Sequence, residues 1–314
     1  LYCYEADQQA LPPGVHVVRV RPQPRGHLLP AALFPWLVAR AIRPDHDVVL
    51  AQGGNCLSST FSLFHTCHLL RRETMALVAQ ERGRPLNVRE RLNLLVRQGL
   101  FERLERRTLL RCPGRCFAVS SRLADDLARV HGVDRAALGV APNGVDHSVF
   151  NPQARRFRAE VRREMGLGEK ELVALFIGGI WWEKGLHVAL RAVAQCALSW
   201  HLLVAGSDDD TQVFLRLAQD LGVSGQVHFL GRTDTPVRLY GAADCLILPS
   251  RFEGFPLVAL EGAACGLPVL ISQEGHPGDL VDGTTGFVLP RTPEAFAGAL
   301  ADLGTSRERL QTLG

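Results

Sequence analysis

The sequence alternates short apolar runs with segments of helical length, and few folds are compatible with this alternation. In the second half of the chain, runs typical of buried strands lie at 172–178, 200–206, 226–231, 244–250, 267–272 and 287–290. Comparable runs in the first half lie at 16–20, 47–52, 60–66, 117–120 and 138–141. Strands that alternate with helices build parallel sheets, because each helix returns the chain to the edge where the next strand starts. We therefore expect two α/β units, each with a parallel sheet.

The boundary between the two units is expected in a turn-rich segment. Residues 142–152 combine Pro, Asn, Gly and Asp, which are typical of turns and linkers. A chain of 314 residues is long enough for two domains. We expect an N-terminal domain over residues 1–150, a C-terminal domain over residues 151–314, and a ligand site in the crevice between them.

Overall charge argues against a nucleic-acid-binding protein. The formal net charge is only +3, with 21% charged residues, so no broad basic surface is indicated. The eight cysteines are scattered, and Cys245 and Cys265 lie in apolar surroundings. This usage favours reduced, buried thiols in a cytoplasmic protein over a disulfide framework. No apolar run approaches the ~20 residues that a transmembrane helix needs.

One segment is nevertheless strongly basic. Between Arg71 and Arg115 there are 12 arginines and 5 glutamates. Within it, residues 89–111 predict a long helix with an apolar stripe. The stripe consists of Leu92, Val96, Leu100 and Leu104. It can face the core beneath a solvated, arginine-rich surface, or the segment can bind an anionic membrane at its inner face or a phosphorylated acceptor. The sequence leaves both interpretations open.

Two glutamates lie eight positions apart after the apolar run at 244–250. Pro256 suits the first turn of a helix that continues to about Gly266, so Glu253 lies in a loop and Glu261 among apolar helical residues. A buried, unpaired carboxylate costs on the order of several kcal/mol or takes up a proton. A bound polyhydroxyl ligand would relieve that cost. An ordinary solvated helix face is the alternative.

Lysine is rare in this chain. Of 35 basic residues, only Lys170 and Lys184 are lysines. Lys184 follows an apolar run that breaks at Gly178 and Gly179, and a helix is expected from Leu186. Loops between strand and helix bind ligands in α/β sheets, and helix N-termini favour anions. Lys184 is therefore a candidate phosphate-binding residue, with an exposed loop lysine as the alternative.

Other signatures are weak or missing. His65 follows a strand-like run, where it can contact a ligand or serve a structural role. His65 and His68, with Cys112 and Cys116, match no structural zinc spacing well, so we expect no metal there. The sequence has neither a G-x-x-x-x-G-K-[ST] phosphate loop nor a G-x-G-x-x-G fingerprint at its first helix, which disfavours kinases, ATPases and dehydrogenases.

Several short motifs occur in a fixed order along the chain. They are Phe64-His-Thr66, Ala118-Val-Ser120, Ala141-Pro-Asn-Gly-Val-Asp146, Gly178 to Gly185, Leu203-Val-Ala-Gly206, His228-Phe-Leu-Gly231, Pro249-Ser250, the two glutamates and Gly283-Thr-Thr-Gly-Phe-Val-Leu-Pro290. Each is weak alone, but their order and spacing resemble the GT-B nucleotide-sugar glycosyltransferases of retaining glycosyltransferase family 4. The resemblance implies two Rossmann-like domains with parallel sheets that face a cleft.

The resemblance also implies roles for individual positions. Glu253 would contact the donor sugar or its reaction centre, Glu261 the nucleotide ribose, and Lys184 the diphosphate. His65 would lie near the transferred hexose and the acceptor, which makes it a catalytic candidate beside Glu253 and Lys184. The remaining donor-binding positions would be Gly178, Gly179, Gly231, Arg232, Gly254, Phe255, Pro256 and Leu257.

The implied reaction moves a hexose, with retention, from a nucleotide-diphosphate sugar to a hydroxyl of a glycan or lipid-linked acceptor, as in polysaccharide biosynthesis. A UDP-sugar is the first expectation and a GDP-sugar the next. No cofactor and no metal are expected, because a lysine and helix dipoles neutralise the phosphates in this family and residues 208–210 match no family metal site. A catalytically weak sugar-nucleotide-binding protein and a GT-B epimerase are the alternatives.

The sequence departs from the family pattern in three places. Gly179 stands five positions before Lys184, where many members have an arginine, so Arg232 or Arg251 would have to complete the positive clamp. The first apolar run resembles the family's second strand. The sequence also stops at Gly314, before the helices that usually return to the N-terminal domain. We therefore expect the opening strand and the last helices to be missing from this sequence.

Overall fold

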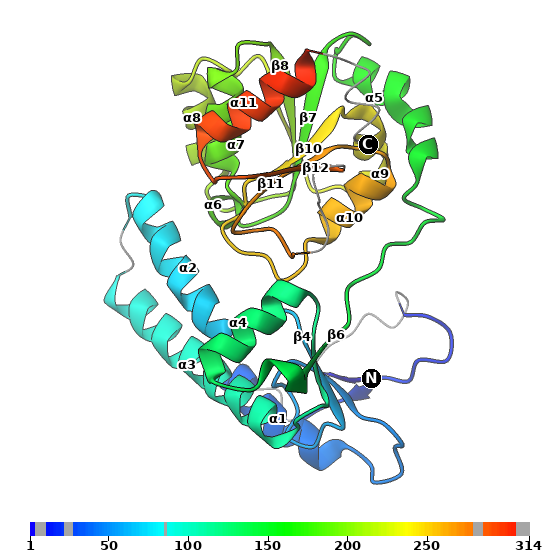
Figure 1. Ribbon diagram of the computed structural model, residues 1–314, viewed down its shortest axis with the longest axis vertical. Coiled ribbons are helices and arrows are strands. Elements are labelled where there is room, and N and C mark those ends of the chain that lie inside the picture. The colour runs from blue at the N-terminus through cyan, green and yellow to red at the C-terminus, as the bar shows by residue number, and fades with distance from the viewer. Residues whose placement is uncertain (4–10, 22–27, 85–86, 279–284, 306–314) are drawn as a thin grey trace. The chain divides into compact units, whose positions relative to one another are not determined.

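The computed structural model describes residues 1–3, 11–21, 28–84, 87–278 and 285–305, without the side chains of residues 28–31, 89 and 93. Gly283 and Thr284 of the last sequence motif lie outside the described residues. The chain divides into two compact units, Leu1–Pro142 and Asn143–Gly314 (Figure 1). The division falls at the start of the turn-rich segment 142–152.

The first unit contains a four-stranded parallel sheet in the order β3-β4-β5-β6. Its strands are β3 (Leu50–Gln52), β4 (Phe61–Phe64), β5 (Cys116–Ala118) and β6 (Leu138–Val140). Its described helices are α1 (Leu28–Ala41), α2 (His68–Glu81), α3 (Val88–Arg111), α4 (Ser121–His131) and the short η2 (Arg135–Ala137). The parallel α/β arrangement predicted for this half is confirmed.

One predicted strand pairs outside this sheet. The run at 16–20 yields β2 (Val18–Arg19), which pairs in parallel with β1 (Tyr2–Cys3) in a separate two-stranded sheet. The Val18 amide donates to the Leu1 carbonyl at 2.8 Å, and the Val20 amide donates to the Cys3 carbonyl at 2.9 Å. The expectation that this run belongs to the main sheet is wrong, because residues 1–3 take up its hydrogen bonds.

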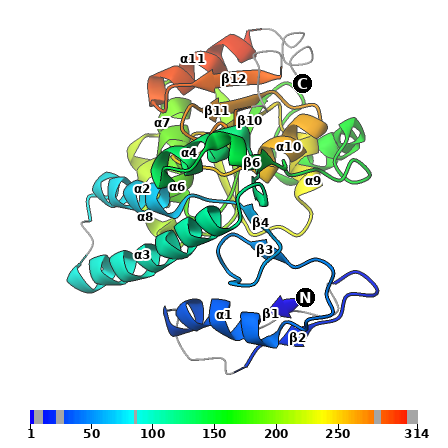
Figure 2. The same cartoon turned by 60° about the horizontal axis from the view of Figure 1, so that its bottom comes forward.

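Helices α2 and α3 lie side by side as a helical hairpin (Figures 1 and 2). A capping box starts α3, in which Asn87 and Glu90 each accept a hydrogen bond from the other's backbone amide. Along the predicted stripe, Leu104 is 8% exposed, but Leu92 is 60% and Val96 46% exposed. A stripe that faces the core throughout is therefore wrong for the first half of α3. A 24-residue helix extends about 36 Å, far more than the three- and four-residue strands of its unit.

The second unit contains a six-stranded parallel sheet in the order β12-β11-β10-β7-β8-β9. Its strands are β7 (Leu172–Ile177), β8 (Trp200–Ala205), β9 (Val227–Gly231), β10 (Cys245–Leu248), β11 (Val269–Ser272) and β12 (Gly286–Leu289). Its described helices are η3 (Pro152–Phe157), α5 (Arg158–Glu164), α6 (Trp181–Lys184), α7 (Leu186–Gln195), α8 (Thr211–Asp220), α9 (Pro236–Ala242), α10 (Leu257–Ala264) and α11 (Pro293–Gly304). Helices α7, α8 and α11 cover one face of the sheet, and α5, α9 and α10 cover the other (Figure 1).

The strand order of this sheet creates a switch point between β7 and β10. The chain passes from β7 through β8 to β9 at one edge, then returns to β10 and continues through β11 to β12 at the opposite edge. The loops that leave the carboxyl ends of β7 and β10 therefore turn to opposite faces of the sheet. In open α/β sheets, ligands bind at this position.

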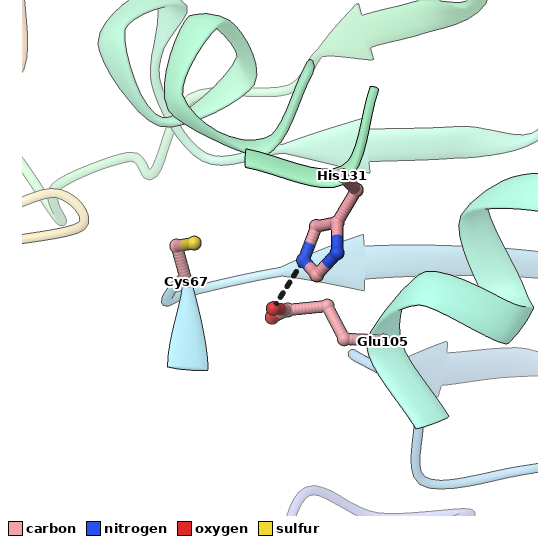
Figure 3. A group of neighbouring side chains, drawn as sticks. All are labelled: Cys67, Glu105 and His131. Atoms are coloured by element: carbon pink, nitrogen blue, oxygen red, sulfur yellow. Dashed lines mark hydrogen bonds and ion pairs between the residues drawn. The ribbon is translucent and has the colours of Figure 1, made fainter. Parts of the chain in front are cut away.

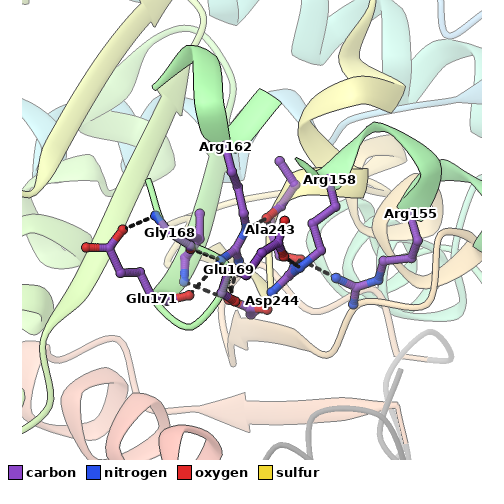
Figure 4. A network of polar contacts seen from close by, with 10 residues as sticks. Arg155, Arg158, Arg162, Gly168, Glu169, Glu171, Ala243 and Asp244 are labelled. Carbon is purple, nitrogen blue, oxygen red and sulfur yellow. Dashed lines mark hydrogen bonds and ion pairs between the residues drawn. The ribbon is translucent and has the colours of Figure 1, made fainter. Parts of the chain in front are cut away.

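A polar network fixes the amino ends of the two central strands (Figure 4). Asp244, which precedes β10, accepts hydrogen bonds from Arg162 at 2.7 Å, from Arg158 at 2.8 Å and from the Val173 amide at 2.9 Å. Arg162 is only 1% exposed, and this burial lowers its guanidinium pKa while Asp244 acts in the opposite direction. The network joins α5 to the amino ends of β7 and β10, opposite the loops that follow their carboxyl ends.

Candidate functional site

Lys184 lies just after β7, beside the switch point. The segment that joins β7 to α7 contains the short helix α6, so the expectation of a plain loop up to Leu186 is wrong in this detail. Ile180, which precedes α6, has a φ of 49°, and Gly185, which follows it, has a φ of 80°. These two left-handed residues turn the backbone sharply on either side of α6, and Lys184 is its last residue.

Two aspartates after β8 hold α6 in place. The Trp181 amide donates to Asp208 Oδ2 at 2.7 Å, and the Trp182 indole donates to Asp210 Oδ2 at 2.9 Å. Both tryptophans are buried, at 2% and 9% exposure. Sequence reasoning considered residues 208–210 only as a metal site and missed this role. Their position after a strand that neighbours β7 was the available signal.

A close backbone contact joins the loops after β7 and β10. A Cβ atom on Gly185 would lie 2.0 Å from the Pro249 carbonyl oxygen, so only glycine fits there. The Arg251 amide also donates to the Glu183 carbonyl at 2.9 Å. Arg291, which the sequence did not single out, donates to the carbonyls of Pro249 at 2.8 Å and Trp182 at 3.4 Å.

This contact brings Lys184 and Glu253 together. The Lys184 ammonium lies 2.6 Å from Glu253 Oε1 and 2.7 Å from Oε2, although 69 positions separate the two residues. Their side chains are 26% and 10% exposed. Gly178 leaves room for the lysine, because a Cβ atom there would lie 3.3 Å from Lys184 Cγ. The pair places a cation and a carboxylate at the switch point, where one ligand could meet both.

Glu261 lies in α10, on the segment that follows Glu253. It is half-buried, and its Oε2 accepts a hydrogen bond from the Tyr240 hydroxyl at 2.7 Å. Burial and the neighbouring carboxylate both raise the pKa of Tyr240, so this residue remains a phenol and a donor. Tyr240, which the sequence did not identify, thus supplies the half-buried carboxylate of Glu261 with a partner from α9.

The other predicted donor-binding residues lie on loops of the same unit. Gly254 and Pro256 are buried, Phe255 is half-buried, and Leu257 at the start of α10 is 50% exposed. Gly178, which is half-buried, and exposed Gly179 follow β7, while Gly231 and Arg232, both exposed, stand at the end of β9. The predicted residues of this unit therefore follow β10 and β7, which are neighbours, and β9, which β8 separates from β7.

His65 belongs to the first unit. It directly follows β4, and its side chain is exposed. Partial desolvation lowers the pKa of His65, so the imidazole is held in its neutral form near pH 7. Its predicted proximity to the donor sugar stays a prediction.

The doubly wound parallel sheet, with charged residues paired at its switch point, defines an α/β ligand-binding unit. Residues 157–314 match the family of glycosyl transferases group 1, and residues 1–149 match Glycosyltransferase Family 4. The chain belongs to these glycosyltransferases, as the sequence motifs predicted.

Individual relatives agree with this assignment. The chain is 35% identical to the D-inositol 3-phosphate glycosyltransferase of Rhodococcus erythropolis over 214 residues, 63% of this chain and 48% of that protein. It is 33% identical to the enzyme of the same name from Nocardia farcinica over 214 residues, 64% of this chain and 47% of that protein. The chain thus spans about half the length of these curated relatives.

Solved structures share the fold. WaaG, a glycosyltransferase involved in lipopolysaccharide biosynthesis, has a TM-score of 0.76 and 21% identity, over 98% of this chain and 82% of its own. HepE of Anabaena, solved in complex with UDP, has a TM-score of 0.67 and 20% identity, over 95% of this chain and 78% of its own. The likeness to WaaG confirms the predicted GT-B type of parallel α/β fold.

Proposed function

We propose that this protein transfers a hexose, with retention, from a nucleotide-diphosphate sugar to a hydroxyl of a glycan or lipid-linked acceptor. The contact between Lys184 and Glu253 at the switch point of the second sheet carries this proposal. A UDP-sugar is the favoured donor, since HepE was solved with UDP, and a GDP-sugar comes next. Family membership supplies the reaction class.

Electrostatics gives Lys184 its role. Breaking the bond between the anomeric carbon and the phosphate oxygen leaves charge on the departing nucleoside diphosphate, and fixed positive groups lower that barrier. Lys184 supplies one, and the amino end of α10 supplies partial positive charge after Pro256. The acceptor attacks the face from which the diphosphate departs, so no protein nucleophile is assigned.

The two glutamates divide the remaining tasks. Before the donor binds, Glu253 orients the Lys184 ammonium. Once the diphosphate binds Lys184, Glu253 accepts hydrogen bonds from the transferred sugar. Glu261 accepts hydrogen bonds from the ribose, with Tyr240 fixing its orientation. His65 is proposed to act near the hexose and acceptor hydroxyl. The remaining donor-binding positions keep the roles that the family resemblance implies.

The proposed reaction needs no metal. Asp208 already accepts from the Trp181 amide through one carboxylate oxygen and from the Asp210 amide through the other, at 2.7 and 2.8 Å. One oxygen therefore holds the start of α6, and the other holds the backbone of Asp210. Lys184 and the α10 dipole supply the positive charge that a cation would otherwise bring to the diphosphate.

We further propose peripheral contact with an anionic membrane at the cytoplasmic, inner face. Among the described residues of the α2–α3 hairpin, six large apolar residues within the arginine-rich segment Arg71–Arg115 are exposed. They are Leu77, Val88, Leu92, Leu95, Val96 and Leu110, with exposures of 44% to 83%. Apolar residues among arginines suit a lipid surface that carries the acceptor. Within the described residues, no helix has the length and apolar character needed to cross a membrane.

The deciding experiment combines nucleotide binding with turnover. Thermal stability is measured with UDP, GDP, ADP and dTDP, because a ligand of the native state raises its stability. Donor consumption is then followed with UDP-hexoses, with and without candidate acceptors, on protein that includes any flanking sequence the gene encodes. We expect UDP to stabilise most and the sugar to be transferred. UDP binding without turnover would instead indicate a sugar-nucleotide-binding protein, and an epimerised donor would indicate an epimerase.

A further inference from the structure

Three buried side chains that the proposed reaction does not use converge inside the first unit (Figure 3). Cys67, Glu105 and His131 are 0%, 1% and 5% exposed. Their ligand-type atoms, a sulfur, a carboxylate oxygen and an imidazole nitrogen, all lie within 4.8 Å of one another. His131 Nε2 is 2.8 Å from Glu105 Oε2. The thiol of Cys67 faces this pair (Figure 3).

Each member of the cluster comes from a different helix. Cys67 is the N-cap of α2, Glu105 lies in the second half of α3, and His131 is the last residue of α4. Serine, threonine, aspartate or asparagine usually fills an N-cap, and Cys67 makes no side-chain capping bond. Instead Glu105 Oε2 accepts a hydrogen bond from the His68 amide at 3.1 Å. A cysteine is thus an unusual residue at this N-cap.

The donor set has the chemistry of a zinc site. Zinc is bound by cysteine thiolate, histidine nitrogen and carboxylate oxygen, at about 2.0 to 2.3 Å in a tetrahedron. Those bond lengths place neighbouring ligand atoms roughly 3.3 to 3.8 Å apart. Here one pair is at 2.8 Å and all lie within 4.8 Å. The separations between ligand atoms therefore need to change by about 1 Å or less.

Charge balance also suits a buried divalent ion. A thiolate, a carboxylate and a neutral imidazole together carry two negative charges, which a zinc ion cancels. A neutral site avoids the large cost of an uncompensated charge in the protein interior.

We propose that Cys67, Glu105 and His131 bind one zinc ion, which fastens the start of α2 to α3 and α4. A water molecule completes the tetrahedron. The ion is structural and belongs to the first unit, so it is separate from the metal-free transfer reaction proposed for the donor site. His68, considered from the sequence, does not belong to this cluster; its Nδ1 lies 3.0 Å from Gln98 Oε1 instead.

The test uses the untagged, full chain. Metal content is measured by mass spectrometry after purification without chelator, and we expect about one zinc per chain, in line with a single site. The chain is then stripped with a chelator and titrated with Co²⁺. Sulfur coordination gives a thiolate-to-cobalt charge-transfer absorption, and tetrahedral geometry gives intense visible bands. Zinc should displace the cobalt, release protons from the thiol and raise the thermal unfolding temperature.

Matched cysteine variants locate the ion. Cys67→Ser should abolish the charge-transfer band and the zinc content. Cys116→Ser should keep both, because Cys116 is a buried thiol of the same unit that donates to the Thr108 carbonyl at 3.8 Å instead. Glu105→Gln and His131→Gln should weaken zinc binding.

The spectrum of the unaltered chain decides the question even where a variant fails to fold. Folded wild-type protein that binds no cobalt, or binds it without a sulfur charge-transfer band, would overturn the proposal. The cluster would then be a buried, hydrogen-bonded His131–Glu105 pair beside the Cys67 thiol. A band that persists in folded Cys67→Ser would overturn it equally.

Discussion

At the scale of single residues, the pairing of Lys184 with Glu253 is the basis of the proposed donor site. The ammonium contacts both carboxylate oxygens, so its charge is compensated and its position fixed before any ligand arrives. A diphosphate that replaces Glu253 at the Lys184 ammonium, or binds the ammonium beside it, meets a cation already in place. Preorganised charge of this kind lowers a barrier without reorganisation during the reaction.

Replacing Glu253 should therefore affect turnover more than binding. In Glu253→Gln, Lys184 keeps the charge proposed to bind the diphosphate, but it loses the carboxylate that orients it and that is proposed to contact the sugar. We expect kcat to fall about 100-fold, with a small change in the donor KM. Steady-state kinetics with the preferred UDP-hexose measures both. Equal and negligible changes in kcat and KM would contradict the assignment.

Replacing Glu261 should have the opposite signature. Glu261→Gln removes the charged acceptor proposed for the ribose, and hydrogen bonds to charged groups are worth about 1.5 to 3 kcal/mol. We expect UDP to bind roughly 10- to 100-fold more weakly, as measured by calorimetry. Tyr240→Phe serves as the control, because it removes only the hydroxyl that orients Glu261 and should weaken binding less. An unchanged UDP affinity in Glu261→Gln would favour a merely structural glutamate.

At the scale of elements, the close contact between two loops creates the candidate site. Gly185 ends α6 and starts α7 while its backbone lies against Pro249. This contact brings Lys184 within reach of Glu253. Close packing of backbone on backbone requires a residue without a side chain.

A methyl group at Gly185 should separate the two loops. Gly185→Ala combines a left-handed backbone with a severe clash, so we expect a loss of about 2 to 5 kcal/mol in stability together with weaker UDP binding. Gly222→Ala is a matched control, because its φ of 72° is similar but no atom lies within 4 Å of the added Cβ. It should cost about 1 to 2 kcal/mol. Chemical denaturation and nucleotide titration compare the two; equal losses would refute the proposed contact effect.

At the amino ends of the central strands of the same sheet, the polar network depends on Asp244. Asp244→Asn leaves the guanidinium of Arg162 buried without its counter-charge, and breaking a buried pair in this way costs about 3 to 5 kcal/mol. Asp126→Asn is the comparison, since its partner Arg129 is 65% exposed and exposed pairs contribute about 1 kcal/mol or less. Urea denaturation of both variants measures the difference. A loss for Asp244→Asn as small as that for Asp126→Asn would show that the network is not needed for stability.

Sequence patterns predicted the repeating elements but not the contacts that join them. Apolar runs predicted the strands of both parallel sheets, because a buried strand is a continuous run of apolar residues in the sequence. The short helix α6 escaped detection, since buried tryptophans and two aspartates 24 to 29 positions away stabilise it, and no local pattern records them. Tyr240 was missed for the same reason, because it meets Glu261 across 21 positions. The paired glutamates and the rare lysine were visible because their residue types contrasted with their surroundings.

At the scale of the whole molecule, charge is distributed unevenly. A net charge of +3 conceals the surplus of seven positive charges between Arg71 and Arg115. The exposed apolar residues of the α2–α3 hairpin lie within this same segment. One part of the chain is thus strongly basic, while the remainder carries a small net negative charge.

This asymmetry predicts salt-sensitive binding to anionic vesicles. Changing Arg103, Arg106 and Arg107 together to glutamine should weaken binding by roughly 100-fold, because each arginine near a charged surface contributes about 1 kcal/mol. Vesicle sedimentation at low and high salt measures the effect, with neutral vesicles as the control. Unchanged binding by the triple variant would remove this segment from the membrane proposal.

The scarcity of lysine has a practical consequence. Lys170 is exposed, whereas Lys184 is engaged by Glu253. An amine-acylating reagent meets only these two lysine side chains, and the ion pair slows its reaction with Lys184. The ratio of the labels on Lys170 and Lys184, measured in separate peptides, therefore reports whether Glu253 still holds the Lys184 ammonium. This measurement probes the place where the donor is proposed to bind.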